Sequence, residues 1–200
     1  MDTKSLFNIG YGLYVLTANN ENKDNGCIIN TVMQITSEPL QIAICVNKMN
    51  YTNEMIKKSQ KFNISILTTD TDFETFKNFG YRSGKNCNKF ESFNDTLRSE
   101  NGLLYITKNT NSYISAKVVQ ETEFKTHTMF IATVTDAKCL SDKPTVTYDY
   151  YQNNIKPKPK QTEKTGWRCK ICGYVYEGEI LPEDYICPLC KHGAIDFEKI

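Results

Sequence analysis

Four cysteines near the C-terminus have the spacing of a metal site. They form two C-x-x-C pairs, Cys169–Cys172 and Cys187–Cys190, separated by residues 173–186. A C-x-x-C turn aims two thiolates at one metal, and two such turns complete a tetrahedral set of four sulfurs. The N-terminal residues lack the pattern of a signal peptide, so we interpret the pairs as metal ligands rather than disulfides. The surrounding unit is too short to bury a sufficient core, and we expect metal binding to supply much of its folding free energy.

The residues around the pairs bear on which metal is bound. A tetrahedral sulfur site suits zinc or iron, and a structural zinc ribbon is the alternative to a redox centre. Aromatic residues are dense here and could pack a dry shell that helps to set a redox potential: Trp167, Tyr174, Tyr176, Tyr185 and Phe197. Gly173 follows the first pair, where it frees the backbone to turn N–H groups toward sulfur. His192 is expected to be a surface side chain, because four sulfurs need no fifth ligand.

The C-terminal region resembles rubredoxin. The matching residues are W-x-C-x-x-C-G-Y-V-Y-E-G-E, then C-P-L-C and G-A-x-D-F-E, and they span residues 166–200. The short spacer between the pairs is similar to that of the rubredoxin module at the end of rubrerythrins. The resemblance implies one iron, cycling between Fe³⁺ and Fe²⁺, with Cys169, Cys172, Cys187 and Cys190 as its ligands.

The elements of residues 1–151 are predicted to be mainly β. Short runs rich in Val, Ile and Thr recur, at 12–18, 27–37, 40–47, 62–68, 113–122 and 127–140. Asn25-Gly26 is a strong hairpin-turn signal between the first two runs. Helical patterns cover residues 52–60 and 70–79. Many strands with few helices favour a β-barrel.

One strand–loop–helix run contains a candidate ligand site. Lys48 and Thr52 flank the start of a helix, where a cation, a hydroxyl and free N–H groups make a phosphate cradle. Asn30, Thr31 and Gln34 on the preceding strand could hydrogen-bond a flat polar ring. Taken alone, the pattern also fits an ordinary strand–helix unit with a polar start.

The same run resembles the flavin reductase-like family of FMN-binding split barrels. The shared features are N-T-V-M-Q-x-T-S-x-P, V-N-K-x-x-Y-T, F-N-I-S-I-L, F-G-Y-R-S-G-K with K-F downstream, and H-T-M-F-I-A-T-V-T-D-A. The resemblance implies a homodimer and an FMN site lined by Asn30, Thr31, Val32, Met33, Gln34, Ser37, Cys45, Val46, Asn47, Lys48 and Thr52. His127 is either near the nicotinamide of NAD(P)H or a hydrogen-bonded strand-end histidine.

The whole chain is similar to the high-molecular-weight rubredoxins of anaerobes. This implies electron transfer from NAD(P)H through FMN to the iron and on to a partner such as a flavodiiron protein, which reduces oxygen or nitric oxide. Two alternatives are a flavin or ferric reductase with an accessory metal domain, and a non-catalytic flavin-binding sensor with a zinc ribbon.

The composition of the chain also indicates where its domains begin and end and in which cell compartment it is expected. We predict a flavin domain at 1–151, a Lys/Pro-rich flexible linker at 152–165 and an iron domain at 166–200. The iron domain holds four Lys/Arg and six Asp/Glu, a net charge of −2, whereas the whole chain is +1. Neither value favours nucleic-acid or membrane binding, and the chain is expected to be cytoplasmic. N-x-S/T matches at Asn50, Asn63 and Asn94 are expected to be chance.

Overall fold

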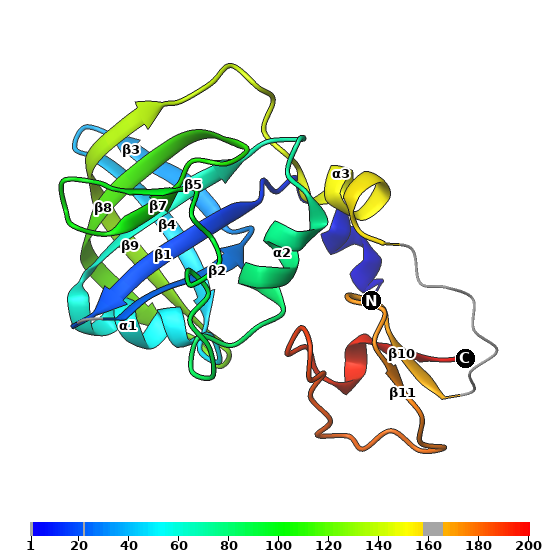
Figure 1. Ribbon diagram of the computed structural model, residues 1–200. Helices are drawn as coiled ribbons and strands as arrows, with labels where there is room; N and C mark the ends of the chain where they lie inside the picture. Colours follow the sequence, from blue (N-terminus) through cyan, green and yellow to red (C-terminus); the bar gives the residue numbers. More distant parts are fainter. Residues whose placement is uncertain (1, 22, 158–165) are drawn as a thin grey trace. The chain divides into compact units, whose positions relative to one another are not determined.

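The computed structural model describes residues 2–21, 23–157 and 166–200. Its internal contacts divide the chain into two compact units, Met1–Lys156 and Pro157–Ile200 (Figure 1). Each unit is described by itself below.

The large unit is built on a seven-stranded antiparallel sheet that curls into a barrel (Figure 1). The strand order is β2-β1-β5-β8-β9-β4-β3, and hairpins of consecutive strands supply three of the six pairings. The strands are β1 (Tyr14–Asn20), β2 (Lys23–Ile29), β3 (Val32–Ser37), β4 (Leu40–Asn47), β5 (Lys61–Leu67), β8 (Thr110–Glu123) and β9 (His127–Cys139). This arrangement confirms the mainly β prediction.

Two apolar cores lie on opposite faces of β1. Leu16 belongs to the cluster inside the barrel, together with Phe62 and Phe130. Its neighbour Val15 belongs to a second cluster, which Phe76 and Phe79 join. Alternate residues of a strand point to opposite faces, so the successive buried residues Val15 and Leu16 show that this part of β1 is covered on both faces.

Helices cover the barrel's end and its outer face. The helix α1 (Tyr51–Ser59) contributes Met55 and Ile56 to the barrel core. The helix α2 (Phe73–Gly80) begins at Asp72, whose carboxylate accepts hydrogen bonds from the N–H and the hydroxyl of Thr75, both at 2.9 Å. Shorter helical segments are η1 (Thr3–Asn8), α3 (Tyr148–Tyr150) and the π-helical η2 (Tyr151–Ile155).

Three expectations from the sequence need correction. Asn25-Gly26 does not form the hairpin turn but lies within β2, opposite Ala18 and Thr17. Phe79 packs closely against Gly26 there: an added Cβ would stand 3.1 Å from the Phe79 ring, so a larger residue would have to displace that ring slightly. The single strand expected over 27–37 is two strands, β2 and β3, broken at residues 30–31.

The third correction concerns the expected linker. Its first residues, 152–155, are helical within η2, because Tyr151 is buried against Phe76 and hydrogen-bonds the Tyr81 hydroxyl at 2.9 Å. Residues 158–165 of the expected linker lie outside the described part of the chain.

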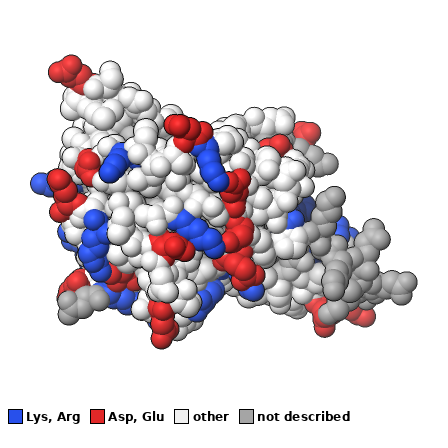
Figure 2. All heavy atoms as spheres, turned by 45° about the horizontal axis from the view of Figure 1, so that its top comes forward, with Lys and Arg blue, Asp and Glu red and all other residues white. Residues whose placement is uncertain are grey.

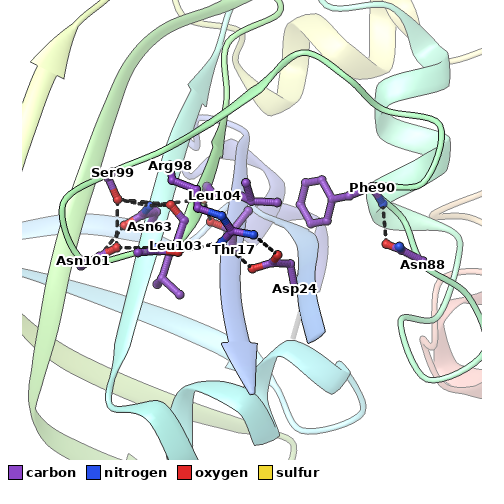
Figure 3. Close-up of polar contacts among 11 residues, drawn as sticks. Thr17, Asp24, Asn63, Asn88, Phe90, Arg98, Ser99, Asn101, Leu103 and Leu104 are labelled. Atoms are coloured by element: carbon purple, nitrogen blue, oxygen red, sulfur yellow. Dashed lines mark hydrogen bonds and ion pairs between the residues drawn. The ribbon is translucent and has the colours of Figure 1, made fainter. Parts of the chain in front are cut away.

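A buried polar network joins β5 to a small hairpin that the sequence did not predict. The hairpin is formed by β6 (Thr96–Arg98) and β7 (Leu104–Ile106). Asn63 on β5 is fully buried; its amide nitrogen donates to Ser99 Oγ at 2.7 Å and its amide oxygen accepts from Asn101 at 2.8 Å (Figure 3). The same nitrogen also lies 3.2 Å from the carbonyls of Leu103 and Leu104. Asn63 therefore has a structural role, consistent with a chance N-x-S match.

Charged side chains of both signs alternate on the surface shown in Figure 2. Many are paired across elements that are distant in sequence, including Arg98 with Asp24 at 2.7 Å and Lys108 with Asp72 at 2.8 Å. Such exposed pairs each contribute little to stability. No helix among the described residues has both the length and the apolar character needed to span a membrane.

The small unit holds a three-stranded sheet in the order β11-β10-β12. Its strands are β10 (Trp167–Cys169), β11 (Val175–Tyr176) and β12 (Phe197–Lys199), and η3 (Ala194–Asp196) precedes the last one. So little regular structure leaves the four cysteines as the main organising feature of this unit.

Candidate metal centre and flavin site

The four C-terminal cysteines converge on one point. Their sulfur atoms all lie within 4.8 Å of one another. Cys169 Sγ is 3.5 Å from Cys190 Sγ, and Cys172 Sγ is 3.4 Å from Cys187 Sγ. Four sulfurs around a metal at about 2.3 Å would be about 3.8 Å apart, so the cluster matches a tetrahedral site closely. The donor set thus fits the predicted single metal.

Each cysteine pair sits on a loop whose N–H groups face the sulfurs. In the first loop, the N–H groups of Cys172 and Tyr174 donate to the sulfurs of Cys169 and Cys172. In the second loop, the N–H groups of Cys190 and His192 donate to the sulfurs of Cys187 and Cys190. Hydrogen bonds of this kind stabilise thiolate character and help to tune a bound metal.

An aromatic shell surrounds the sulfurs, as predicted. Tyr185 packs between Tyr176 and Phe197, at ring-centroid distances of 4.7 and 5.4 Å. Trp167 and Tyr174 join the same cluster, in which Cys169 and Cys187 are fully buried. The outer pair, Cys172 and Cys190, is half-buried. His192 is exposed and points its Nδ1 at the Cys190 carbonyl, 3.0 Å away, in agreement with a surface role.

The residues predicted to line the flavin come from adjacent strands at one edge of the barrel. Val32, Met33, Gln34 and Ser37 lie on β3, the edge strand that pairs with β4. Asn30 and Thr31 precede it, and the Thr31 hydroxyl donates to the Cys45 carbonyl on β4 at 2.7 Å. Met33 and Gln34 are exposed, and Asn30, Thr31 and Val32 are half-buried. These side chains therefore leave an accessible polar and apolar surface along β3.

The predicted phosphate lysine lies in a cluster of charges. Lys48, just after β4, is 2.5 Å from the Glu123 carboxylate, which also pairs with Lys57 of α1. These two ammonium groups lower the pKa of Glu123 to about 2. Any stability from this pairing is present above the ordinary pKa of 4.5 and is lost as the pH falls toward 2.

Glu123 and Lys57 were not singled out from the sequence. Glu123 ends β8, where its local pattern is that of a strand end, and its partners are brought to it only by the β4–β9 and β8–β9 pairings. Two lysines against one carboxylate leave this corner with an excess of one positive charge.

Two predicted flavin contacts are buried in this arrangement. Val46 and Thr52 have no exposed surface, and the Thr52 hydroxyl accepts a hydrogen bond from Asn25 at 2.9 Å. Asn53, the next residue, donates to the Val46 carbonyl at 3.0 Å. These contacts fix the start of α1 to β2 and β4, so both side chains have structural roles in this arrangement.

His127 begins β9 directly opposite Asn47 of β4. Its Nδ1 is 2.8 Å from the Thr126 hydroxyl, and the residue is half-buried. The β8–β9 turn that carries it also accepts the Lys48 backbone N–H, at Thr126 O, 2.9 Å away. Both sequence interpretations of His127, a strand-end hydrogen bond and a place at the edge of the site, are compatible with this position.

The four scattered cysteines differ in exposure. Cys27 is buried, as expected for a small apolar residue, and burial raises the pKa of its thiol. Cys45 and Cys87 are half-buried, and Cys139, the last residue of β9, is exposed. A free cysteine is usually a buried small apolar residue, and Cys139 departs from this because β9 runs past the end of the apolar core.

Comparison with known proteins agrees with both halves of the structure. The model of the flavin reductase like domain matches residues 6–158, and that of the rubrerythrin, rubredoxin-like domain matches residues 167–198. The chain therefore belongs to the flavin reductase-like family, in the form that carries a C-terminal rubredoxin-like domain. As a member of this family it is an oxidoreductase.

One similar relative matches this chain over its full length. The high molecular weight rubredoxin of Moorella thermoacetica is 38% identical over 230 aligned positions, which cover 100% of both chains. The ferric-chelate reductase (NAD(P)H) of Archaeoglobus fulgidus is 36% identical over 162 positions, covering 81% of this chain and 95% of that protein.

Solved structures support the barrel. The NADH:FAD oxidoreductase of Streptomyces globisporus superposes with a TM-score of 0.65 at 17% identity, over 72% of this chain and 84% of that one. At this identity the likeness shows the fold, which is that of the flavin reductases.

Proposed function

We propose that this protein is an electron-transfer flavoprotein that takes electrons from NAD(P)H through FMN to a single iron held by four cysteines. The observation that carries the proposal is the presence in one chain of a flavin reductase-like barrel and a preformed four-sulfur site. FMN, when bound, accepts two electrons as hydride, and iron carries one at a time. The chain's own residues must hold the flavin, exclude water from it and ligate the iron.

The charge cluster supports FMN as the flavin. Lys48 and Lys57 place two ammonium groups beside α1, and their excess positive charge suits a terminal phosphate. The Asn50 side chain at the start of α1 makes no capping hydrogen bond, which leaves this helix end available for an anion. Along β3, Asn30, Thr31, Val32, Met33, Gln34 and Ser37 would face the ring and ribityl chain, with Cys45 and Asn47 beside them.

Replacing Lys48 by alanine is expected to weaken FMN binding about tenfold or more, because a charge-assisted contact to phosphate contributes about 1.5–3 kcal/mol. The dissociation constant is measured by flavin fluorescence on the apoprotein. Lys58, exposed on α1 and unpaired with Glu123, provides the matched control, and Lys58→Ala should bind FMN as the wild type does. Equal weakening of FMN binding in both variants would show that Lys48 does not hold the phosphate.

A further part of the proposal concerns partners and location. The exposed apolar side chains of Met33, Ile35 and Leu40 on the edge hairpin β3–β4 support a homodimer with flavin near its interface. The acidic iron domain suits docking to a basic patch on an external acceptor, and we propose a flavodiiron protein as that acceptor. We propose a cytoplasmic location and an iron domain at 166–200, joined to the flavin domain by a linker that begins after η2.

An anaerobic absorption experiment tests the route. Pure protein is reconstituted with FMN and iron and then mixed with NADH or NADPH, and the flavin and iron bands are followed. Bleaching of both bands supports the proposal. Bleaching of flavin alone, or a protein that binds only zinc when grown with ample iron, would contradict it.

The similarity to a ferric-chelate reductase supports a second candidate. In this reading the barrel reduces flavin or ferric chelates by itself, and the metal domain is accessory. Deleting residues 157–200 separates the two functions. Unchanged turnover with ferric chelate would favour the second candidate, and loss of electron delivery to an added rubredoxin acceptor would favour the first.

A further inference from the structure

The two cysteine loops make equivalent backbone hydrogen bonds but carry different residues after their second cysteine. The N–H of Gly173 donates to the Cys169 carbonyl at 2.8 Å, and the N–H of Lys191 donates to the Cys187 carbonyl at 3.0 Å. Both residues follow the second cysteine of their pair, and both have left-handed backbones, with φ of 78° and 64°. Glycine adopts this conformation freely, whereas a residue with a Cβ is disfavoured there. Lysine is thus an unfavourable local choice in the second loop.

The lysine side chain folds back over its own loop. Its Nζ donates to the carbonyl of Pro188 at 3.0 Å, and Pro188 lies between the ligands Cys187 and Cys190. Lys191 is half-buried, and no ion pair within the described residues 166–200 joins it to a carboxylate. Lys170, in the first loop, instead directs its Nζ to the Ile195 carbonyl at 3.1 Å. An unneutralised positive charge is therefore held against the second cysteine loop.

The charge of Lys191 affects how readily the iron is reduced. A site of Fe³⁺ and four thiolates has a net charge of −1, and reduction to Fe²⁺ by one electron changes the net charge to −2. The domain around the site already has an excess of acidic groups, with six Asp/Glu against four Lys/Arg. Such surroundings oppose reduction, and a nearby cation favours it.

We propose that the ammonium of Lys191 raises the reduction potential of the iron. The higher potential favours the transfer of electrons from flavin to the iron. The inference depends on iron occupying the four-sulfur site, as in the proposed function. The proposal accounts for the lysine at position 191, where the first loop has Gly173. The left-handed backbone of Lys191 lets its side chain turn back over the loop, which places the ammonium at the Pro188 carbonyl.

The test is a spectroelectrochemical titration of the iron-loaded, full-length protein, with dithionite and redox mediators. We expect Lys191→Gln to lower the ratio of reduced to oxidised iron at a fixed potential about three- to tenfold, the effect of one unit charge at close range. A tenfold change corresponds to about 59 mV for one electron. Lys191→Arg should keep the wild-type ratio, as should Lys199→Gln on β12, the matched charge control.

Further variants separate charge from backbone effects. Lys191→Gly should lower the ratio as far as Lys191→Gln does, while also raising the unfolding temperature of the zinc-loaded protein, because glycine removes the left-handed strain. An unchanged ratio in Lys191→Gln, or an equal loss in Lys191→Arg, would overturn the proposal. Dithionite reduces the iron without NAD(P)H or flavin, so this result is independent of whether the proposed electron route operates.

Discussion

Replacing Cys169 by alanine is expected to abolish iron binding and to unfold the small unit, with more than about a hundredfold loss of metal affinity. Cys169 is fully buried, and its sulfur lies 3.5 Å from that of Cys190. Alanine offers no ligand atom. A unit of this size depends on the metal for most of its folding free energy, and metal binding contributes about 10–16 kcal/mol at structural zinc sites in small domains. Iron content, visible absorbance and amide exchange of residues 166–200 are the measurements.

The large unit provides the internal control for this variant. Its two cores are complete within residues 13–155, so its thermal transition should not change. Cys139→Ala, which removes an exposed thiol from the large unit, should retain full iron content. If Cys169→Ala still held one iron per chain, the four-sulfur site would not be the iron site.

Replacing Asn63 by alanine is expected to destabilise the large unit by about 3 kcal/mol. The substitution removes the hydrogen bonds of a buried amide and leaves the Asn101 amide nitrogen without its acceptor. Ser99 and the two carbonyls keep other partners, so about one buried group is left unsatisfied, at about 1–3 kcal/mol, and the lost bonds add to that cost. For a unit of this size the loss corresponds to a decrease in Tm of roughly 6–12 °C. Calorimetry of the full chain measures it.

A second variant tests whether hydrogen bonds or volume set this cost. Asn63→Leu fills the space but satisfies no polar partner, so it should be at least as unstable as Asn63→Ala. Asn153, exposed on η2 with a single side-chain bond to Asp149 at 3.0 Å, serves as the control site. Recovery of stability in Asn63→Leu would mean that packing, and not the polar network, holds the β6–β7 hairpin.

The features that could be predicted from the sequence are those encoded locally. The metal site is one, because its four ligands come from two short loops whose spacing is visible in the chain. The helices expected at 52–60 and 70–79 correspond to α1 and α2, since their apolar spacing and their starts are local signals. The order of the strand-like runs was enough to predict the barrel.

The features that could not be predicted depend on contacts between distant residues. Asn25-Gly26 has the local pattern of a turn, but it lies within β2, where Phe79 packs closely against the glycine. Glu123 reaches Lys48 only through the strand pairings, and no residue near it signals that role. Thr52 has the position of a phosphate ligand in the sequence, yet its hydroxyl is engaged by Asn25 on β2. In each case a tertiary contact overrides or completes a local preference.

The exposed thiol of Cys139 offers an attachment point for a probe of the distance between the two units. It ends β9, whereas His127 begins that strand, and thirteen residues of β-strand separate positions by roughly 40 Å. A maleimide fluorophore attached there would be remote from the strand end proposed to hold flavin. Quenching of its emission by a coloured iron centre would then report the distance between the units in solution, during turnover as well as at rest.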